Sequence, residues 1–512
     1  MFDKNNSGSI LRVTFFVAMI SICSKILGFF RETIIAAYFG ATASTDAFFF
    51  AHSMPEMIFP SVCSGMSTAF ISLYVKKLEM DVDDGNEYAS RVLRFSVFVG
   101  IVLSVVGVLI SPIIVRIFAP GFDEKQIKLA TNLTVMSMAA FILIMLQYMI
   151  TSILNSNKCF VSPQVVALFY NIVIISLTML LGERQSLYIL GLTFIIGQCV
   201  YVLGLFFLLY SGGISISFKI RPHKEEIVEL LSIMGPILLG NAVIQINSIV
   251  DKVLGSLLPS GSLSGLSYSH TLCNIITGVF ISSLSTVLYP TFTSIISQND
   301  YERLAMTIEK YIIILNVITI PISIFFMFNS LEIVSVIYQR KNFDQNAVNL
   351  TAYALMCYAP MFSFYGVREV LSRAFFAMQD TKTPMINTSI GVLINIVCSV
   401  SLIRLIGIGG IAIGTSVSSA ITCFLLFINI CGREKRIDYI RIIKKIVLLM
   451  IIGIVTVSIE FLLGYITFSS NMLKVIIGGI VCFTVYFGLV VIVNADIRSV
   501  ILIKIRQLAK KS

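Results

Sequence analysis

The chain is dominated by long apolar segments, each about as long as a helix that crosses a lipid bilayer. A hydrocarbon core of about 30 Å needs about 20 apolar residues in a helix, since each residue advances about 1.5 Å. Stretches such as FILIMLQYMITSIL are apolar on every face, which fits a helix in lipid and not an alternating β-strand. The sequence therefore predicts an all-α integral membrane protein with 14 transmembrane helices, at 11–38, 46–75, 92–118, 129–155, 163–182, 186–211, 227–256, 264–293, 305–329, 350–377, 385–406, 410–431, 441–465 and 473–494.

Basic residues are distributed unevenly between the loops that join these segments. When the fourteen spans are threaded alternately through a membrane, most of the 37 Lys and Arg residues fall on the side that holds both termini. Cytoplasmic loops carry such an excess, so both termini are predicted to be cytoplasmic. The net charge of +10 then reflects topology and contact with anionic lipid, not nucleic-acid binding. The basic residues on this side include Lys76, Lys77, Arg91, Arg94, Lys219, Arg221, Lys224, Arg433, Lys435, Arg436, Lys444, Lys445, Lys510 and Lys511.

Weak self-similarity divides the chain into two halves. Phe122, Asp123 and Leu129 match Phe343, Asp344 and Leu350, each 221 residues further on, and Pro163 matches Pro384 at the same offset. This period places spans one to six over spans seven to twelve in the same orientation, an arrangement typical of transporters with two lobes. We predict two pseudo-symmetric six-helix lobes, 1–215 and 216–436, followed by two extra C-terminal helices and a basic cytoplasmic tail within 437–512.

Charged residues inside the predicted spans are the candidate functional residues, because a charge at mid-bilayer costs about 2.5–3.5 kcal/mol and usually faces water or a partner. They cluster by half: Lys25, Arg31, Glu32, Asp46 and His52, then Asp251, Lys252, Arg368, Glu369 and Arg373, with His270 in the eighth span.

Two arrangements are open for the first span. Lys25 and Arg31 are six residues apart and diverge by about 120° on a regular helix. A bend at Gly28 would bring both cations to one cavity, whereas a regular helix would leave Arg31 to pair with Glu32 or with a carboxylate of a neighbouring helix. Glu369 and Arg373 are four apart and are expected to pair along their own helix, and Asp251 is expected to pair structurally with Lys252.

An excess of cations in a cavity between two lobes suits an anionic substrate, and a diphosphate above all, because guanidinium and ammonium groups donate charge-assisted hydrogen bonds. The short loops leave no room for a soluble catalytic domain, and no P-loop occurs. No His pair at i, i+4 and no Cys/His spacing predicts a metal site. The sequence therefore predicts a transporter without enzymatic activity, metal or cofactor.

The segment SKILGFFRETIIAAYFGATASTDAFFFAHSMPEMI carries the most specific motif, and IFAPGF, YQRKNFD and LSRAFFAMQDTKTP support it. With these motifs the sequence resembles the bacterial MurJ/MviN family, the lipid II flippases of the MOP exporter superfamily. The resemblance implies movement of an undecaprenyl-diphosphate-linked peptidoglycan precursor from the inner to the outer leaflet of the cytoplasmic membrane by alternating access. It also implies a role in cell-wall biogenesis and cell shape, contact with cell-wall synthesis machinery, and a monomer.

The resemblance assigns roles residue by residue. Lys25 stands where the family usually has Arg, Arg31 keeps the second Arg, and Asp46 keeps the acid of TDAFF. It implies a substrate-binding central cavity with Lys25, Arg31, Asp46, His52 and His270, and a second-lobe or coupling role for Asp251, Lys252, Arg368, Glu369 and Arg373. Gly28, Gly40 and Pro55 keep structural positions of the motif.

Several positions depart from the family pattern. Phe59 and Pro60 stand where Arg is expected, Ser64 replaces an acid, and Ser269 and His270 replace an Asp-Arg pair. The cavity therefore holds less fixed positive charge than is typical, which leaves a flippase for another polyprenyl-diphosphate-linked saccharide as the main alternative. A drug or cation exporter of the same superfamily and a non-transporting membrane scaffold are weaker alternatives.

Overall fold

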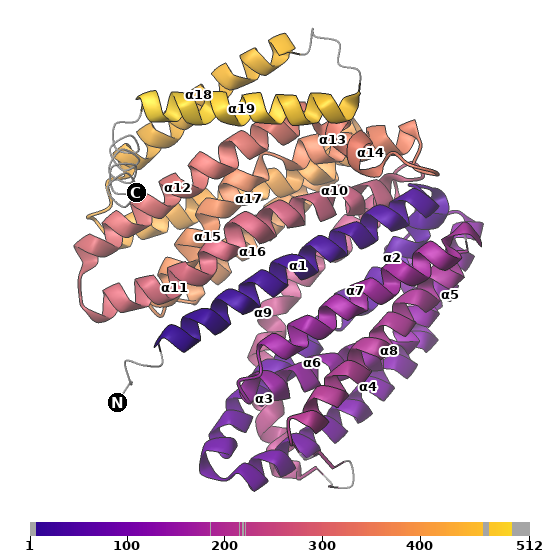
Figure 1. The fold of residues 1–512 in the computed structure, drawn as a ribbon. Helices are drawn as coiled ribbons and strands as arrows, with labels where there is room; N and C mark the ends of the chain where they lie inside the picture. Colours follow the sequence, from indigo (N-terminus) through magenta and orange to yellow (C-terminus); the bar gives the residue numbers. More distant parts are fainter. Residues whose placement is uncertain are drawn as a thin grey trace, which may run out of the picture. The chain divides into compact units, whose positions relative to one another are not determined.

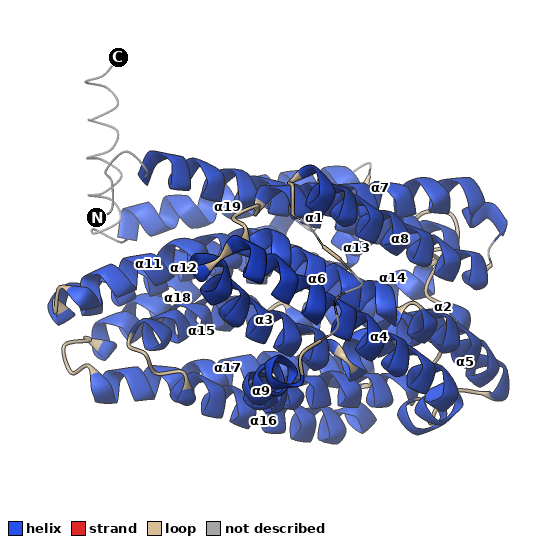
Figure 2. Ribbon diagram, turned by 90° about the horizontal axis from the view of Figure 1, so that it is seen from below, coloured by secondary structure: helices blue, strands red, loops and turns tan. Residues whose placement is uncertain are grey.

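The computed structural model describes residues 7–184, 186–214, 216–217, 220, 222–463 and 470–493, and these residues form helices joined by short loops, with no strand among them (Figures 1 and 2). The basic tail expected at the C-terminus, with Lys510 and Lys511, and the loop residues Lys219 and Arg221 lie outside the described residues. The α-helices are α1 (Ser7–Phe39), α2 (Ala43–Ile58), α3 (Pro60–Met80), α4 (Val82–Phe118), α5 (Glu124–Ala139), α6 (Phe141–Ser156), α7 (Val161–Leu181), α8 (Leu187–Ser211), α9 (Lys224–Ser256), α10 (Ser262–Ile276), α11 (Ser282–Ser297), α12 (Tyr301–Phe328), α13 (Ser330–Tyr338), α14 (Gln345–Tyr358), α15 (Met361–Ala377), α16 (Lys382–Ile406), α17 (Ile408–Arg433), α18 (Tyr439–Leu463) and α19 (Asn471–Val493).

Within the described residues, nine helical segments are long and apolar enough to cross a membrane, and the bent pair α14–α15 makes a tenth. These segments confirm a multi-pass, all-helical membrane protein. The other long helical segments, α1, α9, α10–α11 and α18, coincide with further predicted spans. The full count of fourteen stays a prediction.

The chain forms two compact units, and their boundary differs from the predicted one at residue 215/216. The first unit comprises 1–271 with 340–347, and the second comprises 272–339 with 348–512. Helix α9 belongs to the first unit because it packs on α3 and also contacts α2 and α4. The packing is close, since a Cβ built on Gly65 of α3 would lie 3.1 Å from Met234 Cγ of α9.

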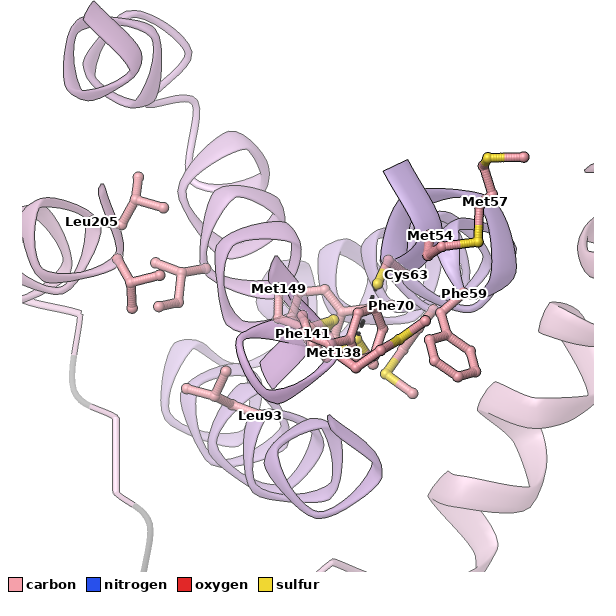
Figure 3. Close-up of a cluster of buried hydrophobic side chains, with 14 of the residues drawn as sticks. Met54, Met57, Phe59, Cys63, Phe70, Leu93, Met138, Phe141, Met149 and Leu205 are labelled. Carbon is pink, nitrogen blue, oxygen red and sulfur yellow. Dashed lines mark hydrogen bonds between the residues drawn. The ribbon is translucent and has the colours of Figure 1, made fainter. Parts of the chain in front are cut away.

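Interrupted helices shape the first unit. Phe59 separates α2 from α3, with Pro60 as the first residue of α3, and Ala140 separates α5 from α6. Near both breaks lies a core rich in sulfur and aromatic groups, in which the rings of Phe59 and Phe141 are 4.9 Å apart (Figure 3). Flexible Met side chains fill the irregular space that two broken helices leave.

Corresponding positions of the two predicted repeats have the same local structure. Asp123 accepts a hydrogen bond from the backbone N–H of Gln126 (2.7 Å) at the start of α5, and Asp344 accepts one from Ala347 (2.8 Å) at the start of α14. Both helices end at a break, at Ala140 in the first repeat and at Ala359 and Pro360 in the second, which lie 219 and 220 residues further on. This correspondence supports the internal repeat.

In the second unit, α18 and α19 pack on α12 around Ile320, Leu449, Ile452, Tyr486 and Val490 (Figure 1). Ion pairs add to this packing. Glu309 of α12 pairs with Arg441 (3.2 Å) and Lys445 (3.4 Å) at the start of α18. Glu332 of α13 pairs with Lys474 (2.5 Å) at the start of α19. The ion pairs thus attach α18 and α19, the two helices outside the repeat, to the second unit near the first residues of each helix.

Candidate functional site

Arg31 lies on α1, partly buried, and is held from several sides. Its guanidinium donates to Glu32 Oε1 (2.8 Å from Nη2) and to Asn171 Oδ1 of α7 (3.2 Å from Nη1). It also lies over the rings of Phe194 (5.2 Å) and Tyr170 (5.8 Å), which adds cation–π attraction. Helix α1 continues without a break through Gly28, and Arg31 pairs with Glu32, which is the arrangement expected for a regular helix.

Beside Arg31, the first unit contains a polar pocket of about 130 Å³. Tyr170 and Phe194, the two rings under the guanidinium, form part of its wall. Its polar lining comes from α2, α5, α6, α7 and α8, namely His52, Glu56, Ser137, Gln147, Tyr148, Tyr170 and Gln198. We call it the Glu56 pocket. Convergent polar groups in a cavity at membrane depth are typical of a transporter binding site.

His52 lines the Glu56 pocket, and the sequence predicted it to line a cavity. Its ring is stacked on Phe48 (5.7 Å between centroids, 3° between planes) and lies 4.3 Å from the ring of Phe194. Phe194 is therefore the residue that brings Arg31 and His52 together.

Asp46, in the first turn of α2, lies away from the pocket and contacts the start of α10. Its Oδ1 accepts hydrogen bonds from the backbone N–H (2.7 Å) and the hydroxyl (2.6 Å) of Ser264, and its Oδ2 accepts one from the N–H of Gly261 (2.6 Å). The residue is 3% exposed. Because both oxygens are used inside the protein, this geometry gives Asp46 a structural role as a cap on α10, in place of the substrate contact expected from the sequence.

The turn between α1 and α2 is closed by the loop before α14. Gly40 has φ = +66°, and a Cβ there would lie 2.5 Å from the carbonyl oxygen of Asn342. Asn342 donates its N–H to Ala37 O (3.0 Å), and the Tyr268 hydroxyl donates to Gly40 O (3.1 Å). The motif glycine is thus explained by a positive φ and by close approach of another backbone.

Four other predicted residues of this unit are not among the residues that line the pocket. Lys25 of α1 and His270 of α10 are exposed. On α9, Asp251 accepts a hydrogen bond from Asn247 (3.3 Å), and no ion pair joins Asp251 to Lys252 in the described part of the chain. The two side chains attract each other through their charges without forming an ion pair, and the expected Asp251–Lys252 pair stays a prediction. Pro55, the third motif position, lies inside α2 and lines the Glu56 pocket.

In the second unit, the predicted charges lie along α15. Glu369 pairs with Arg373 (2.7 Å), which confirms the expected pairing along one helix. The guanidinium of Arg368 lies 4.4 Å from the centroid of the Tyr365 ring. These contacts are local to α15 and by themselves indicate a structural role.

Sequence reasoning missed most of the pocket. Asn171, Gln147 and Gln198 are uncharged and come from three different helices, so no spacing joins them in the sequence. Glu56 was visible as a charge in an apolar stretch, PEMIFP, and that signal could have identified it.

Comparison with known proteins places this geometry in a family. The model of the family described as "Lipid II flippase MurJ" matches residues 35–481. The chain belongs to this family. Curated relatives include a probable lipid II flippase MurJ of Buchnera aphidicola subsp. Acyrthosiphon pisum, 29% identical over 87% of this chain and 89% of the relative. Another, from Treponema pallidum, is 26% identical over 82% of each chain.

Solved structures agree on the fold. A lipid II flippase MurJ in an inward closed conformation superposes with a TM-score of 0.79, at 24% identity, over 93% of this chain and 98% of that chain. An inward-facing multidrug resistance MATE family transporter of the MOP superfamily gives a TM-score of 0.70 at 13% identity, over 82% of this chain and 99% of the other. The MurJ family assignment thus agrees with a transporter fold shared across the MOP superfamily.

Proposed function

We propose that this protein moves lipid II, an undecaprenyl-diphosphate-linked peptidoglycan precursor, from the inner to the outer leaflet of the bacterial cytoplasmic membrane. The family match over residues 35–481 is the observation that carries the proposal. The protein acts as a transporter and makes or breaks no covalent bond.

Arg31 is the residue we assign to the diphosphate. In the described conformation it is held by one carboxylate, one amide oxygen and two rings, so its position is fixed before substrate binds. A diphosphate can replace the amide and aromatic contacts with charge-assisted bidentate hydrogen bonds while the pairing with Glu32 persists. Lys25 is exposed on α1 and points about 120° away from Arg31 on the unbroken helix, so we assign it to a part of the anionic headgroup other than the one that Arg31 binds.

Contacts between loops support the alternating passage of the spans through the membrane, and the excess of Lys and Arg on one side supports the cytoplasmic position of both termini. Within the first unit, Arg91 pairs with Glu226 (2.9 Å), and Gln126 donates to Ala43 O (3.1 Å); each contact joins loops assigned to one side of the membrane. Within the second unit, Arg433 pairs with Asp380 (2.5 Å), and both residues are assigned to the cytoplasmic side. Fourteen spans with cytoplasmic termini satisfy all of these contacts.

Alternating access requires that each end of the substrate path can close. The hydrogen bonds of Asp46 to Gly261 and Ser264, with those of Asn342 to Ala37, hold together loops that the topology assigns to the outer side. We assign these contacts to closure of the outer end. An outward movement of a net anion is assisted by an inside-negative potential, at about 2.3 kcal/mol per charge per 100 mV, so no nucleotide is needed.

A flippase for another polyprenyl-diphosphate-linked saccharide is the second candidate, and one observation favours it. Phe59, at a position where the family resemblance leads us to expect Arg, is buried against Phe141 in the core, and Pro60 begins α3. These positions therefore add no cation to a headgroup site. Fewer cations would suit a substrate with fewer negative charges on its peptide or sugar.

Complementation tests the proposal. The wild-type chain should restore growth of a bacterial strain depleted of its own lipid II flippase. Arg31→Ala and Lys25→Ala should each abolish growth while the protein stays inserted, and Lys128→Ala, at an exposed cation on α5, should grow as wild type. Failure of the wild-type chain, together with rescue of a strain that lacks a different polyprenyl-glycan flippase, would favour the second candidate. Full growth of Arg31→Ala would contradict the assignment of Arg31.

A further inference from the structure

The guanidinium of Arg31 makes hydrogen bonds of two kinds. Its Nε (3.2 Å) and Nη2 (2.8 Å) both donate to one carboxylate oxygen, Glu32 Oε1, whereas its Nη1 donates to the neutral amide oxygen of Asn171 (3.2 Å). A guanidinium has five N–H donors, so these three bonds do not use them all. The bonds to the carboxylate are charge-assisted and are the stronger ones. The bond to Asn171 is therefore the one that an incoming anion displaces most easily.

Asn171 is held on α7 with its amide oxygen toward α1. Its Nδ2 donates to the carbonyl oxygen of Ala167, one turn earlier (3.1 Å), which orients the amide, and the residue is buried. Helices α1 and α7 pack against each other, and a Cβ built on Gly28 of α1 would lie only 3.8 Å from Asn171 Oδ1. The packing of these two helices thus presents the amide oxygen to Arg31 in the absence of any ligand.

The charges around Arg31 do not by themselves favour an anion. The side chain of Arg31 is 19% exposed, so a ligand from solvent can reach it. The charged and titratable groups close to Arg31 and its neighbour His52 are Glu32, Glu56, Tyr170 and Lys252, and Lys252 in turn interacts with Asp46 and Asp251. The four carboxylates of this set offset its two cations. The hydrogen bonds that Arg31 offers therefore decide how tightly an anion binds there.

A neutral acceptor beside Arg31 suits a transporter, which must bind a headgroup and then release it. Very tight binding would slow release, because affinity is set mainly by the dissociation rate. Since Asn171 already accepts from Nη1, a ligand gains only the difference between its own hydrogen bond and that of the amide. A carboxylate in the same place would hold Arg31 with a second negative charge and repel the ligand. An apolar residue would leave the donor to water.

We propose that Asn171 is a competing hydrogen-bond acceptor that sets the affinity of Arg31 for the phosphoryl oxygens of the transported lipid. In the substrate-free protein the amide oxygen of Asn171 accepts from Nη1 of Arg31. A phosphoryl oxygen takes this donor when the headgroup binds, and the amide takes it back when the headgroup leaves. No covalent bond changes. This inference rests on the proposed function, in which Arg31 binds a diphosphate.

The test measures the Kd of geranylgeranyl diphosphate for the purified full-length protein. Asn171→Ala removes the competing oxygen and should lower the Kd about threefold to tenfold, the contribution of one such hydrogen bond. Asn171→Asp keeps the shape of the side chain but adds a charge, and it should raise the Kd at least about tenfold. Asn132→Ala is the matched control and should bind as the wild type, because Asn132 also joins two helices, by donating to the Tyr188 hydroxyl (3.1 Å), but is exposed on α5.

The opposite directions of the two changes distinguish competition from support of the fold, and melting temperatures without the probe show that each variant is folded. A higher Kd in Asn171→Ala would mean that Asn171 positions Arg31 for the ligand, and it would overturn the proposal. Wild-type binding by both Asn171 variants, with binding lost in Arg31→Ala, would overturn it too but leave the assignment of Arg31 intact. If the wild-type chain fails to complement while the opposite shifts in Kd occur, the flippase assignment fails and the role of Asn171 stands. No binding of the probe by the wild type would overturn both.

Discussion

Asp46 and Ser264 are 218 residues apart in the sequence, yet one carboxylate oxygen of Asp46 accepts both the backbone N–H and the hydroxyl of Ser264. The other oxygen takes the N–H of Gly261, so a charge from α2 caps the beginning of α10. A negative charge at a helix N-terminus is stabilised by unsatisfied N–H groups and by the helix dipole. This contact fastens the first repeat to the first part of the second within one compact unit.

Asp46→Asn should therefore destabilise the protein. The amide keeps the shape but loses the charge that strengthens the three hydrogen bonds, and we expect a loss of about 2–3 kcal/mol in the free energy of unfolding. Thermal unfolding can be followed with a thiol-reactive dye, since Cys63 and Cys273 are buried until the chain opens. Asp123→Asn is the matched control, because Asp123 caps α5 in the same way but is exposed. Equal losses in both variants would contradict the special role of Asp46.

Arg91 should be needed to hold the start of α9 against α4. Its side chain is 5% exposed and pairs with Glu226 (2.9 Å), Glu87 (3.0 Å) and Asp84 (3.4 Å). Arg91→Ala removes these three ion pairs and leaves Lys77 to pair with Glu226 (3.1 Å) and Asp84 (3.5 Å), so we expect a loss of about 2–3 kcal/mol in the free energy of unfolding, measured by denaturant titration.

The control for Arg91 is Arg436→Ala, at a side chain that is 57% exposed and 3.8 Å from Glu434. Such surface pairs contribute little, and the change should be below about 1 kcal/mol. A similar loss for both variants would show that burial of Arg91 does not matter.

Gly391→Ala should disrupt the contact between α16 and α17. A Cβ at this position would lie 2.0 Å from Thr422 Oγ1 and 3.2 Å from Ser418 Oγ, so the buried Thr422 side chain or the two helices must shift. Overpacking of this kind costs about 1–3 kcal/mol. Gly432→Ala, where nothing lies within 4 Å, should leave the melting temperature unchanged or raise it slightly. A neutral Gly391→Ala would mean that these helices are less tightly packed than described.

Asp380 should make stability depend on acid pH. It lies in the loop before α16, where hydrogen bonds from the backbone and side chain of Thr383, and then from Arg433, hold the pKa of its carboxyl below the usual value. A carboxylate with a lowered pKa stabilises the folded state above its unfolded pKa of about 3.9, and this contribution is lost as the pH falls through the folded pKa.

The wild type should therefore be more stable than Asp380→Asn by a constant amount between pH 7 and 5, and the difference should shrink below about pH 4. Melting curves of the two proteins across this range provide the measurement. A difference that grows as the pH falls would have the wrong sign for this explanation.

Much of the fold could be predicted from the sequence, because lipid imposes a simple length rule on apolar helices. The helical class follows from it, and the match of Asp123 with Asp344 indicated a repeat whose two copies share a helix cap. The extent of the compact units could not be predicted. The position of α9 depends on close packing of Gly65 against Met234, and no periodicity encodes that contact.

The candidate site was only partly predictable. Arg31 and His52 stood out as polar residues in apolar segments, and both lie at the Glu56 pocket. Asp46 stood out by the same criterion, but it caps a distant helix, and hydropathy cannot distinguish a cap from a ligand. Asn171 and Gln147 are neutral, so they lack the high free energy of a charge in the membrane, which is the signal that identified the other residues in the sequence.

The attachment of α18 and α19 has a practical consequence. Ion pairs of Glu309 and Glu332 attach these helices to α12 and α13. Gly453 of α18 and Gly479 of α19 also allow close packing against Ile324 and Phe325. The two helices should therefore move together with the second unit as one rigid body. Ile454 of α18 and Ile480 of α19 are exposed. A spin label or fluorophore at either position would follow the motion of the second unit during a transport cycle without touching the residues that handle substrate.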